Sequence, residues 1–126
     1  MNQSDSTDFL NPYPVPEGVG WRYQGTLRDE DGNVIPAASF SALTVKIWNM
    51  DAALTNIQAQ TSILNTGRGV LDSNGVLTVK FVPTDSALVD TTKNEERHRA
   101  LIEGDYSGTK KYARRITWRV TNFENR

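Results

Sequence analysis

The 126-residue sequence contains no cysteine. This absence excludes a disulfide framework, a cysteine-ligated metal site and a thiol nucleophile. Histidine is almost as scarce, because His98 is the only one in the chain, and a single histidine does not supply the ligands of the common zinc sites. The fold must therefore rest on packing, and we expect neither a metal nor a cofactor.

Long apolar runs are also missing. No stretch reaches the roughly 18 consecutive apolar residues that a membrane-spanning helix needs. The polar start at residues 1–6 has neither the basic nor the apolar region of a secretory signal. We therefore expect a protein that is made in a cytoplasm and has no membrane partner.

Charge is nearly balanced overall but is unevenly distributed along the chain. The formal net charge is -1, yet residues 1–92 carry 5 Lys and Arg against 10 Asp and Glu, whereas residues 93–126 carry 9 against 5. A basic end of this kind suits nucleic acid or an acidic protein surface. Because acidic residues are interleaved with the basic ones there, nucleic acid is the less favoured partner.

No pattern in the chain predicts a catalytic site. His98 lies between Arg97 and Arg99, and neighbouring cations disfavour a further positive charge on the imidazole, which makes it a poor general base. Residues 67–69 read Gly-Arg-Gly, but they precede a β-like segment rather than the helix N-terminus of a phosphate-binding loop. We expect a protein without enzymatic activity.

What the sequence does contain is a series of turn signals between alternating segments. Asn74-Gly75 predicts a tight hairpin turn, because both residue types tolerate positive φ angles. The segment that follows, residues 76–81, alternates polar residues with Leu77, Val79 and Phe81. This pattern predicts a strand with one buried face, which needs a second layer to cover it.

Asp31-Gly32 is a second turn signal, in an acidic segment. A calcium loop is the alternative reading of the same residues. Counting from Asp29 as the first ligand, however, the positions that require Gly and Glu are occupied by Val34 and Phe40. A structural turn is therefore the favoured interpretation.

Further strands are expected where apolar residues alternate with polar ones. They cover residues 21–28, 43–50, 56–64 and 112–123, with a short helical turn at 83–89 in which Thr84 serves as the cap. Residues 95–106 end as a strand, but 95–100 fit either a helical turn or a strand. The side chains of Ile47, Val79 and Trp118 are expected in one core. The whole pattern predicts an all-β fold, an immunoglobulin-like β-sandwich of about seven strands over residues 19–126.

Residues 1–18 are predicted to form an extended N-terminal arm outside that domain, because its prolines prevent a helix. Four apolar side chains in the arm are candidates for contact with a partner protein: Phe9, Leu10, Tyr13 and Val15. In that case deletion of residues 1–16 leaves the melting temperature unchanged. The alternative is that the arm packs on its own domain.

Trp48 is expected on the outer face of its strand, as a packed edge aromatic or as a further partner contact. Together with Tyr106 and Trp118 on one surface it would form a platform for a carbohydrate or another ligand. This ligand-binding reading is the alternative to an assembly protein.

Several blocks carry a resemblance to a known group of proteins. They are residues 25–36, 43–48, 63–65, 73–76 and 96–101. These blocks resemble small β-rich virion proteins of tailed bacteriophages, and their layout is similar to the immunoglobulin-like N-terminal domain of phage baseplate upper proteins. The resemblance implies a structural virion protein, present in several copies, that binds portal, neck, tail or capsid proteins. A capsid decoration protein is the variant of this reading.

Overall fold

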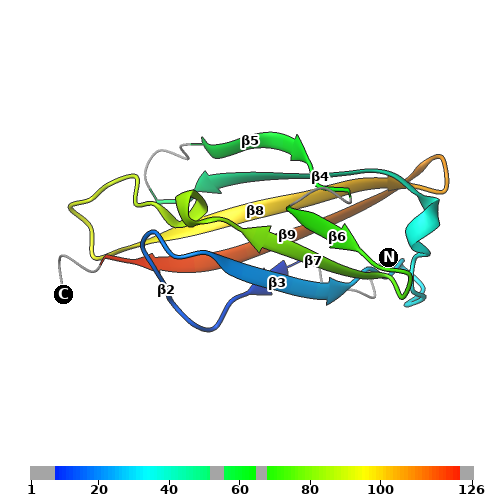
Figure 1. The fold of residues 1–126 in the computed structure, drawn as a ribbon, viewed down its shortest axis with the longest axis horizontal. Coiled ribbons are helices and arrows are strands. Elements are labelled where there is room, and N and C mark those ends of the chain that lie inside the picture. The colour runs from blue at the N-terminus through cyan, green and yellow to red at the C-terminus, as the bar shows by residue number, and fades with distance from the viewer. Residues whose placement is uncertain (1–7, 52–55, 65–67, 123–126) are drawn as a thin grey trace.

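Two β-sheets pack face to face in the computed structural model, which describes residues 8–51, 56–64 and 68–122 (Figure 1). The six-stranded sheet consists of β1 (Asp8–Leu10), β2 (Val15–Pro16), β9 (Lys110–Thr121), β8 (Glu95–Tyr106), β4 (Phe40–Asn49) and β5 (Asn56–Ser62). The three-stranded sheet consists of β3 (Trp21–Thr26), β7 (Val76–Phe81) and β6 (Gly69–Leu71). The predicted all-β, immunoglobulin-like sandwich is confirmed: six strands, β3, β4, β5, β7, β8 and β9, lie on the segments expected from the sequence, and β6, β1 and β2 add to them.

Two short 3₁₀ turns, η1 (Ala37–Ser39) and η2 (Pro83–Ser86), are the helical elements of the described residues. Neither has the length or the apolar character that crossing a membrane requires. Both turns lie where the chain passes between strands.

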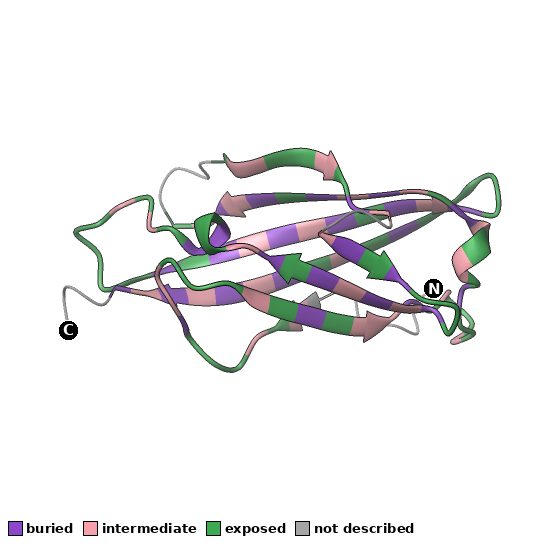
Figure 2. Ribbon diagram, viewed as in Figure 1, coloured by how far each residue is buried: buried purple, intermediate pink, exposed green. Residues whose placement is uncertain are grey.

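The β8–β9 hairpin is the longest element, with an unbroken antiparallel register from Glu95 opposite Thr121 to Tyr106 opposite Lys110. Residues 95–100, which the sequence left open between helix and strand, are therefore strand. Successive side chains of a strand point to opposite faces. Burial alternates accordingly along both strands, as Figure 2 shows.

The core lies between the two sheets. Ile47, Val79 and Trp118 are all fully buried there, so the prediction that they share one core is confirmed. The ring of Trp118 contacts those of Phe81, with centroids 4.7 Å apart, and Trp21, at 5.3 Å, and these two rings stack on each other at 4.8 Å. These three aromatic side chains pack β9 against β3 and β7 of the three-stranded sheet.

The hairpin between β6 and β7 turns at Asp72 rather than at Asn74-Gly75 alone. The Oδ1 atom of Asp72 accepts hydrogen bonds from the backbone N–H groups of Asn74 (2.9 Å) and Val76 (3.0 Å). Gly75 has a φ of 79°, whereas Ser107 is the one residue other than glycine with a positive φ in the described part of the chain. Asn74 thus supplies a turn residue with ordinary φ, and Gly75 alone requires the left-handed conformation.

The acidic turn, Asp29 to Gly32, repeats this arrangement. Asp29 Oδ1 accepts from the N–H groups of Asp31 (2.9 Å) and Asn33 (3.0 Å), and Gly32 has a φ of 84°. An aspartate at the first position and a glycine three residues later therefore build both turns.

The two turns contact each other at one end of the sandwich. The N–H of Leu27 donates to the carbonyl oxygen of Gly75 at 2.9 Å. A Cβ atom added at Gly75 would lie 2.3 Å from Cγ1 of Val34. Gly75 is therefore required both by its backbone angle and by this close approach.

The N-terminal arm packs on its own domain over the residues that the structure describes. β1 and β2 pair in parallel with β9, with Phe9 opposite Ile116 and Val15 opposite Val120. Val15 is 5% exposed, and the Phe9 ring meets Tyr23 at a centroid distance of 5.2 Å. The prediction that Val15 contacts a partner is therefore corrected, because Val15 is buried on its own domain. Phe9 is half-buried. Both strands of the arm complete the edge of the six-stranded sheet, where unpaired backbone groups of β9 attract a further strand.

The two glycines with a left-handed backbone at hairpin turns offer a matched test. Gly108→Ala should lower the free energy of unfolding by about 1 kcal/mol, because its φ of 82° disfavours a side chain but nothing lies within 4 Å of the added Cβ. Gly75→Ala should lower it further, since its Cβ meets Val34. Denaturant unfolding of both variants measures the difference, and equal losses would show that the contact between the turns does not constrain Gly75.

Because the arm packs on its own domain, truncating it should lower the free energy of unfolding. Val15→Ala should cost about 1–2 kcal/mol, because it removes two buried methyl groups. Tyr13→Ala, at a side chain that is 75% exposed, should stay within about 0.5 kcal/mol of the parent. Deletion of residues 1–16 should lower the melting temperature; an unchanged value would restore the reading in which the arm serves only a partner.

Candidate interaction surface

Side chains that are not part of the core, several of them charged, lie together on the outer face of the six-stranded sheet. We define the outer face as the side chains of β4, β8 and β9 that point away from the three-stranded sheet: Lys46, Trp48, Arg97, Arg99, Leu101, Arg115, Thr117 and Arg119. All eight are exposed or half-buried. Strand alternation places them together, because β8 pairs with both β4 and β9.

Arginines face each other on this surface. Arg97 lies directly opposite Arg119 in the β8–β9 register, an arrangement that destabilises a sheet unless other charges offset it. Asp51 accepts from Arg97 Nη2 at 2.9 Å, and Glu95 lies 3.8 Å from Arg119. The hydrogen bond from the Arg97 side chain lowers the pKa of Asp51. These arginines therefore already bind carboxylates in the free protein.

A groove of about 530 Å³ lies between the arm and this part of the outer face. We call it the arginine groove. Its walls are Phe9, Leu10, Asn11, Pro12, Arg97, Arg99, Thr117 and Arg119. One wall is apolar and the other carries guanidinium groups, which bind carboxylates or phosphates through paired N–H donors.

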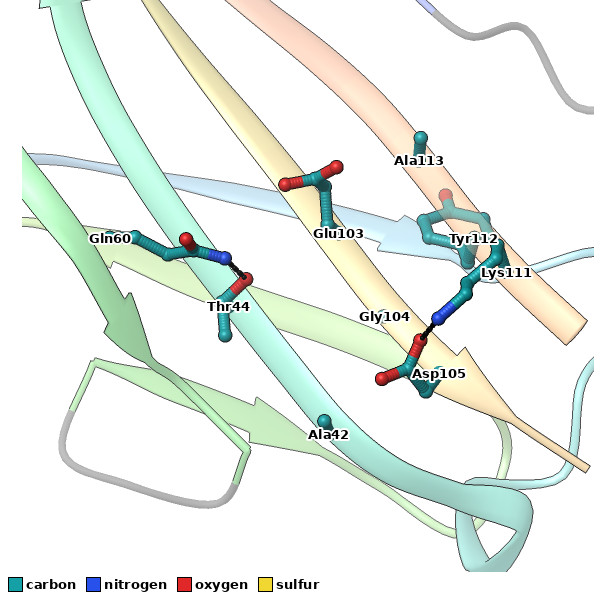
Figure 3. A pocket seen from close by; sticks show the side chains of 9 residues that line it. All are labelled: Ala42, Thr44, Gln60, Glu103, Gly104, Asp105, Lys111, Tyr112 and Ala113. Carbon is teal, nitrogen blue, oxygen red and sulfur yellow. Dashed lines mark hydrogen bonds and ion pairs between the residues drawn. The ribbon is translucent and has the colours of Figure 1, made fainter. Parts of the chain in front are cut away.

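A second hollow, of about 470 Å³, lies on the other half of the same sheet face (Figure 3). Glu103 and Asp105 of β8 line it, and Asp105 pairs with Lys111 of β9. Gln60 of β5 donates to Thr44 at 3.0 Å across the same hollow. The face therefore changes from basic to acidic along β8.

His98 belongs to a buried polar network instead of this surface. Its Nε2 atom lies 3.0 Å from Glu96 Oε1 and its Nδ1 atom 2.9 Å from the carbonyl oxygen of Asp85. Arg97 and Arg99, its neighbours in the sequence, point to the opposite face of the sheet. The side chains of His98 and Glu96 are 0% and 1% exposed, so both lie inside the core.

The same network fastens the loop that connects β7 to β8. The Glu96 carboxylate accepts from the backbone N–H groups of Val89 (2.9 Å) and Asp90 (2.5 Å). The side-chain amide of Asn122 donates to the carbonyl oxygens of Thr91 and Lys93, both at 2.9 Å. Two strands of the six-stranded sheet thus hold the loop at four backbone positions.

Asp85 closes the network at η2. Its carboxylate accepts from the N–H of Val82 at 2.8 Å and pairs with Arg68. Burial raises the pKa of Asp85, although these two contacts act in the opposite direction. Asp85 rather than Thr84 therefore caps this turn, which corrects the sequence expectation.

The structure places the predicted partner-binding residues in different environments. Leu10, 65% exposed, lines the arginine groove, and Trp48 lies half-buried on the outer face with Lys46 Nζ 5.7 Å from its ring centroid. Tyr13 is exposed, and Val15 is buried. The arginines of the groove were missed as a site, although the basic residues at alternate positions of β8 and β9 were a signal for it.

The three aromatic residues of the ligand-binding reading do not share a surface. Tyr106 and Trp118 are 6% and 0% exposed and point into the core, whereas Trp48 is on the outer face. The predicted carbohydrate platform of Trp48, Tyr106 and Trp118 is therefore corrected. The feature that could have excluded it is the alternation of strand positions.

Fold and surface together define an immunoglobulin-like β-sandwich with an arginine-lined groove on one sheet. No model of a known protein family matches the chain, and no curated protein matches it. Among solved structures, it is similar to ACE19, the collagen binding subdomain of the Enterococcus faecalis surface protein ACE, with 11% identity over 80% of this chain and 73% of that chain. The TM-score is 0.24.

Glu96 and its neighbour Glu95 offer a test of the buried network. Glu96→Ala should cost about 3 kcal/mol or more, because it leaves the backbone N–H groups of Val89 and Asp90 without their acceptor and His98 Nε2 without its hydrogen-bond partner. Glu95→Ala, at an exposed position, should change stability by at most about 0.5 kcal/mol. Urea unfolding of the two variants checks the contrast; similar losses would show that Glu96 does not anchor the loop.

Proposed function

We propose that this protein is a non-enzymatic assembly protein that binds other proteins through the outer face of its six-stranded sheet. The observation that carries the proposal is the arginine groove on a sheet face that no other layer of the described chain covers. A groove with one apolar and one cationic wall fits an acidic protein segment that also presents apolar side chains.

The composition of this surface favours a protein partner over nucleic acid. Trp48 and arginine are residue types that protein interfaces use as anchors. Asp51 and Glu95 lie among the arginines and would repel a phosphate backbone, which is the main source of affinity for nucleic acid.

The resemblance of the chain to virion proteins of tailed bacteriophages supplies the setting. We place the protein at the neck or tail of a virion, where it holds neighbouring proteins in position; a role in capsid decoration is the variant. An assembly role agrees with a histidine that is sealed in the core and with arginines that face solvent.

Co-purification with portal, neck and tail proteins of a tailed bacteriophage tests this function. Trp48→Ala should reduce the amount captured about tenfold or more, as expected for an interface anchor worth over about 1.4 kcal/mol. Arg22→Glu, an exposed change on β3 of the other sheet, should leave capture unchanged. The proposal is contradicted if Trp48→Ala and Arg22→Glu both capture these proteins at the parent level. It is also contradicted if neither the parent nor the variants capture them.

A further inference from the structure

We infer that copies of this protein associate head to tail, with the acidic turn of one copy in the arginine groove of the next. The inference rests on the proposed function, since it names one partner of the same surface. It is carried by the charge complementarity of two features of the chain that lie too far apart to meet within one copy.

The acidic turn presents three carboxylates together. Ligand oxygens of Asp29, Glu30 and Asp31 lie within 4.8 Å of one another, and Glu30 and Asp31 are exposed. Within residues 8–51, 56–64 and 68–122, no cation forms an ion pair with Glu30 or Asp31, and Arg28 donates instead to the carbonyl oxygen of Gly32 at 3.0 Å. Carboxylates this close repel one another, and a cationic partner relieves that repulsion.

The turn is also held in one shape before any partner arrives. Asp29 Oδ1 fixes the N–H groups of Asp31 and Asn33, and the bridge between Arg28 and Val34 closes the turn. A ligand that is already ordered loses little conformational entropy on binding. The acidic turn is therefore suited to enter a groove as a rigid unit.

The arginine groove offers the matching chemistry. Arg97 and Arg119 already have carboxylate neighbours, as Asp51 and Glu95 show. Arg99 donates through Nε to Thr117 at 3.0 Å, while its Nη groups make no hydrogen bond to the described residues. Those Nη groups are directed donors for an incoming carboxylate.

Apolar contacts accompany the charges on both sides. Val34, next to the acidic turn, is 41% exposed, and Leu10 on the wall of the groove is 65% exposed. A turn seated in the groove brings apolar surface of this kind together while its carboxylates meet the arginines. The formal net charge of -1 opposes such association very little.

The positions of the two features require a second copy. The chain runs from the acidic turn through η1 to Phe40, which pairs with Tyr106 at the end of β8. Burial raises the pKa of Tyr106, and the nearby carboxylates of Glu30, Asp29 and Asp31 add to this effect. The groove arginines of β8 are seven to nine positions away along the strand, which is roughly 25 Å. Figure 1 shows the segment around residue 30 at the end of the sandwich opposite to the start of β8. Contact between unlike surfaces repeats from copy to copy and builds a ring or a filament.

Sedimentation velocity of the purified full chain tests the inference without any other protein. At low ionic strength the parent should associate as its concentration rises, and about 0.5 M salt should weaken this association at least tenfold, because exposed charges are screened. The double variant Glu30→Lys/Asp31→Lys and the double variant Arg99→Glu/Arg119→Glu should each associate at least tenfold more weakly than the parent. Lys80→Glu, an exposed change on β7, should associate as the parent does.

Mixing the two double variants provides the decisive measurement. The mixture should associate again, because the reversed turn of one variant meets the reversed groove of the other, while the unchanged turn and groove also pair. Melting temperatures equal to that of the parent establish that each variant is folded. A parent that stays monomeric at all concentrations, association that neither double variant weakens, or a mixture that stays monomeric overturns the inference.

The outcomes separate this inference from the proposed function. A monomeric protein that still captures neck and tail proteins through Trp48 overturns the head-to-tail contact alone. Self-association that survives while capture is absent overturns the proposed partners alone. A monomeric parent that binds single-stranded DNA, and loses this binding with Arg99→Glu/Arg119→Glu, assigns the groove to nucleic acid and also overturns the inference.

Discussion

The buried carboxylate of Glu96 is the contact on which the arrangement of the two sheets depends. The chain leaves the three-stranded sheet at β7 and enters the six-stranded sheet at β8, and the loop between them is fastened by hydrogen bonds from Val89 and Asp90 to this one side chain. His98 Nε2 contacts the same Oε1 atom of Glu96 that accepts from Val89, and His98 Nδ1 lies 2.9 Å from the carbonyl oxygen of Asp85 in η2. A buried charge is stable only when its lone pairs are satisfied, so the loop, η2 and β8 are fixed together.

The residues of β8 that point into the core determine which of its residues face solvent. Glu96, His98, Ala100 and Ile102 are committed to the interior, and the residues between them therefore face solvent. Arg97 and Arg99 lie there beside Arg119 and line the groove with it. Asp51 pairs with Arg97 and Glu95 lies near Arg119, and these contacts reduce the repulsion between the arginines of neighbouring strands.

The sequence predicts the backbone conformation of the arm but not what the arm packs against. Its prolines and apolar residues predict extended backbone, and β1 and β2 are extended. Whether Phe9 and Val15 pack on their own domain or on a partner depends on the free edge of β9, which exists only once the six-stranded sheet has formed. The same limit applies to the groove, because arm residues near Leu10 and arginines of β8 and β9 are far apart in the sequence.

Local patterns in the sequence determined most of the strands, though not β1, β2 or β6. They also determined the turns at Asp29 to Gly32 and at Gly75 and the burial of Ile47, Val79 and Trp118. These features follow from residue type and from the period of two along a strand, which neighbouring residues specify by themselves. Only the tertiary structure decided that residues 95–100 are strand, that Asp85 rather than Thr84 caps η2, that His98 bonds to Glu96, and that three arginines share a groove. Each of these depends on register between strands and on contacts over long sequence separations, which become defined when the two sheets pack together.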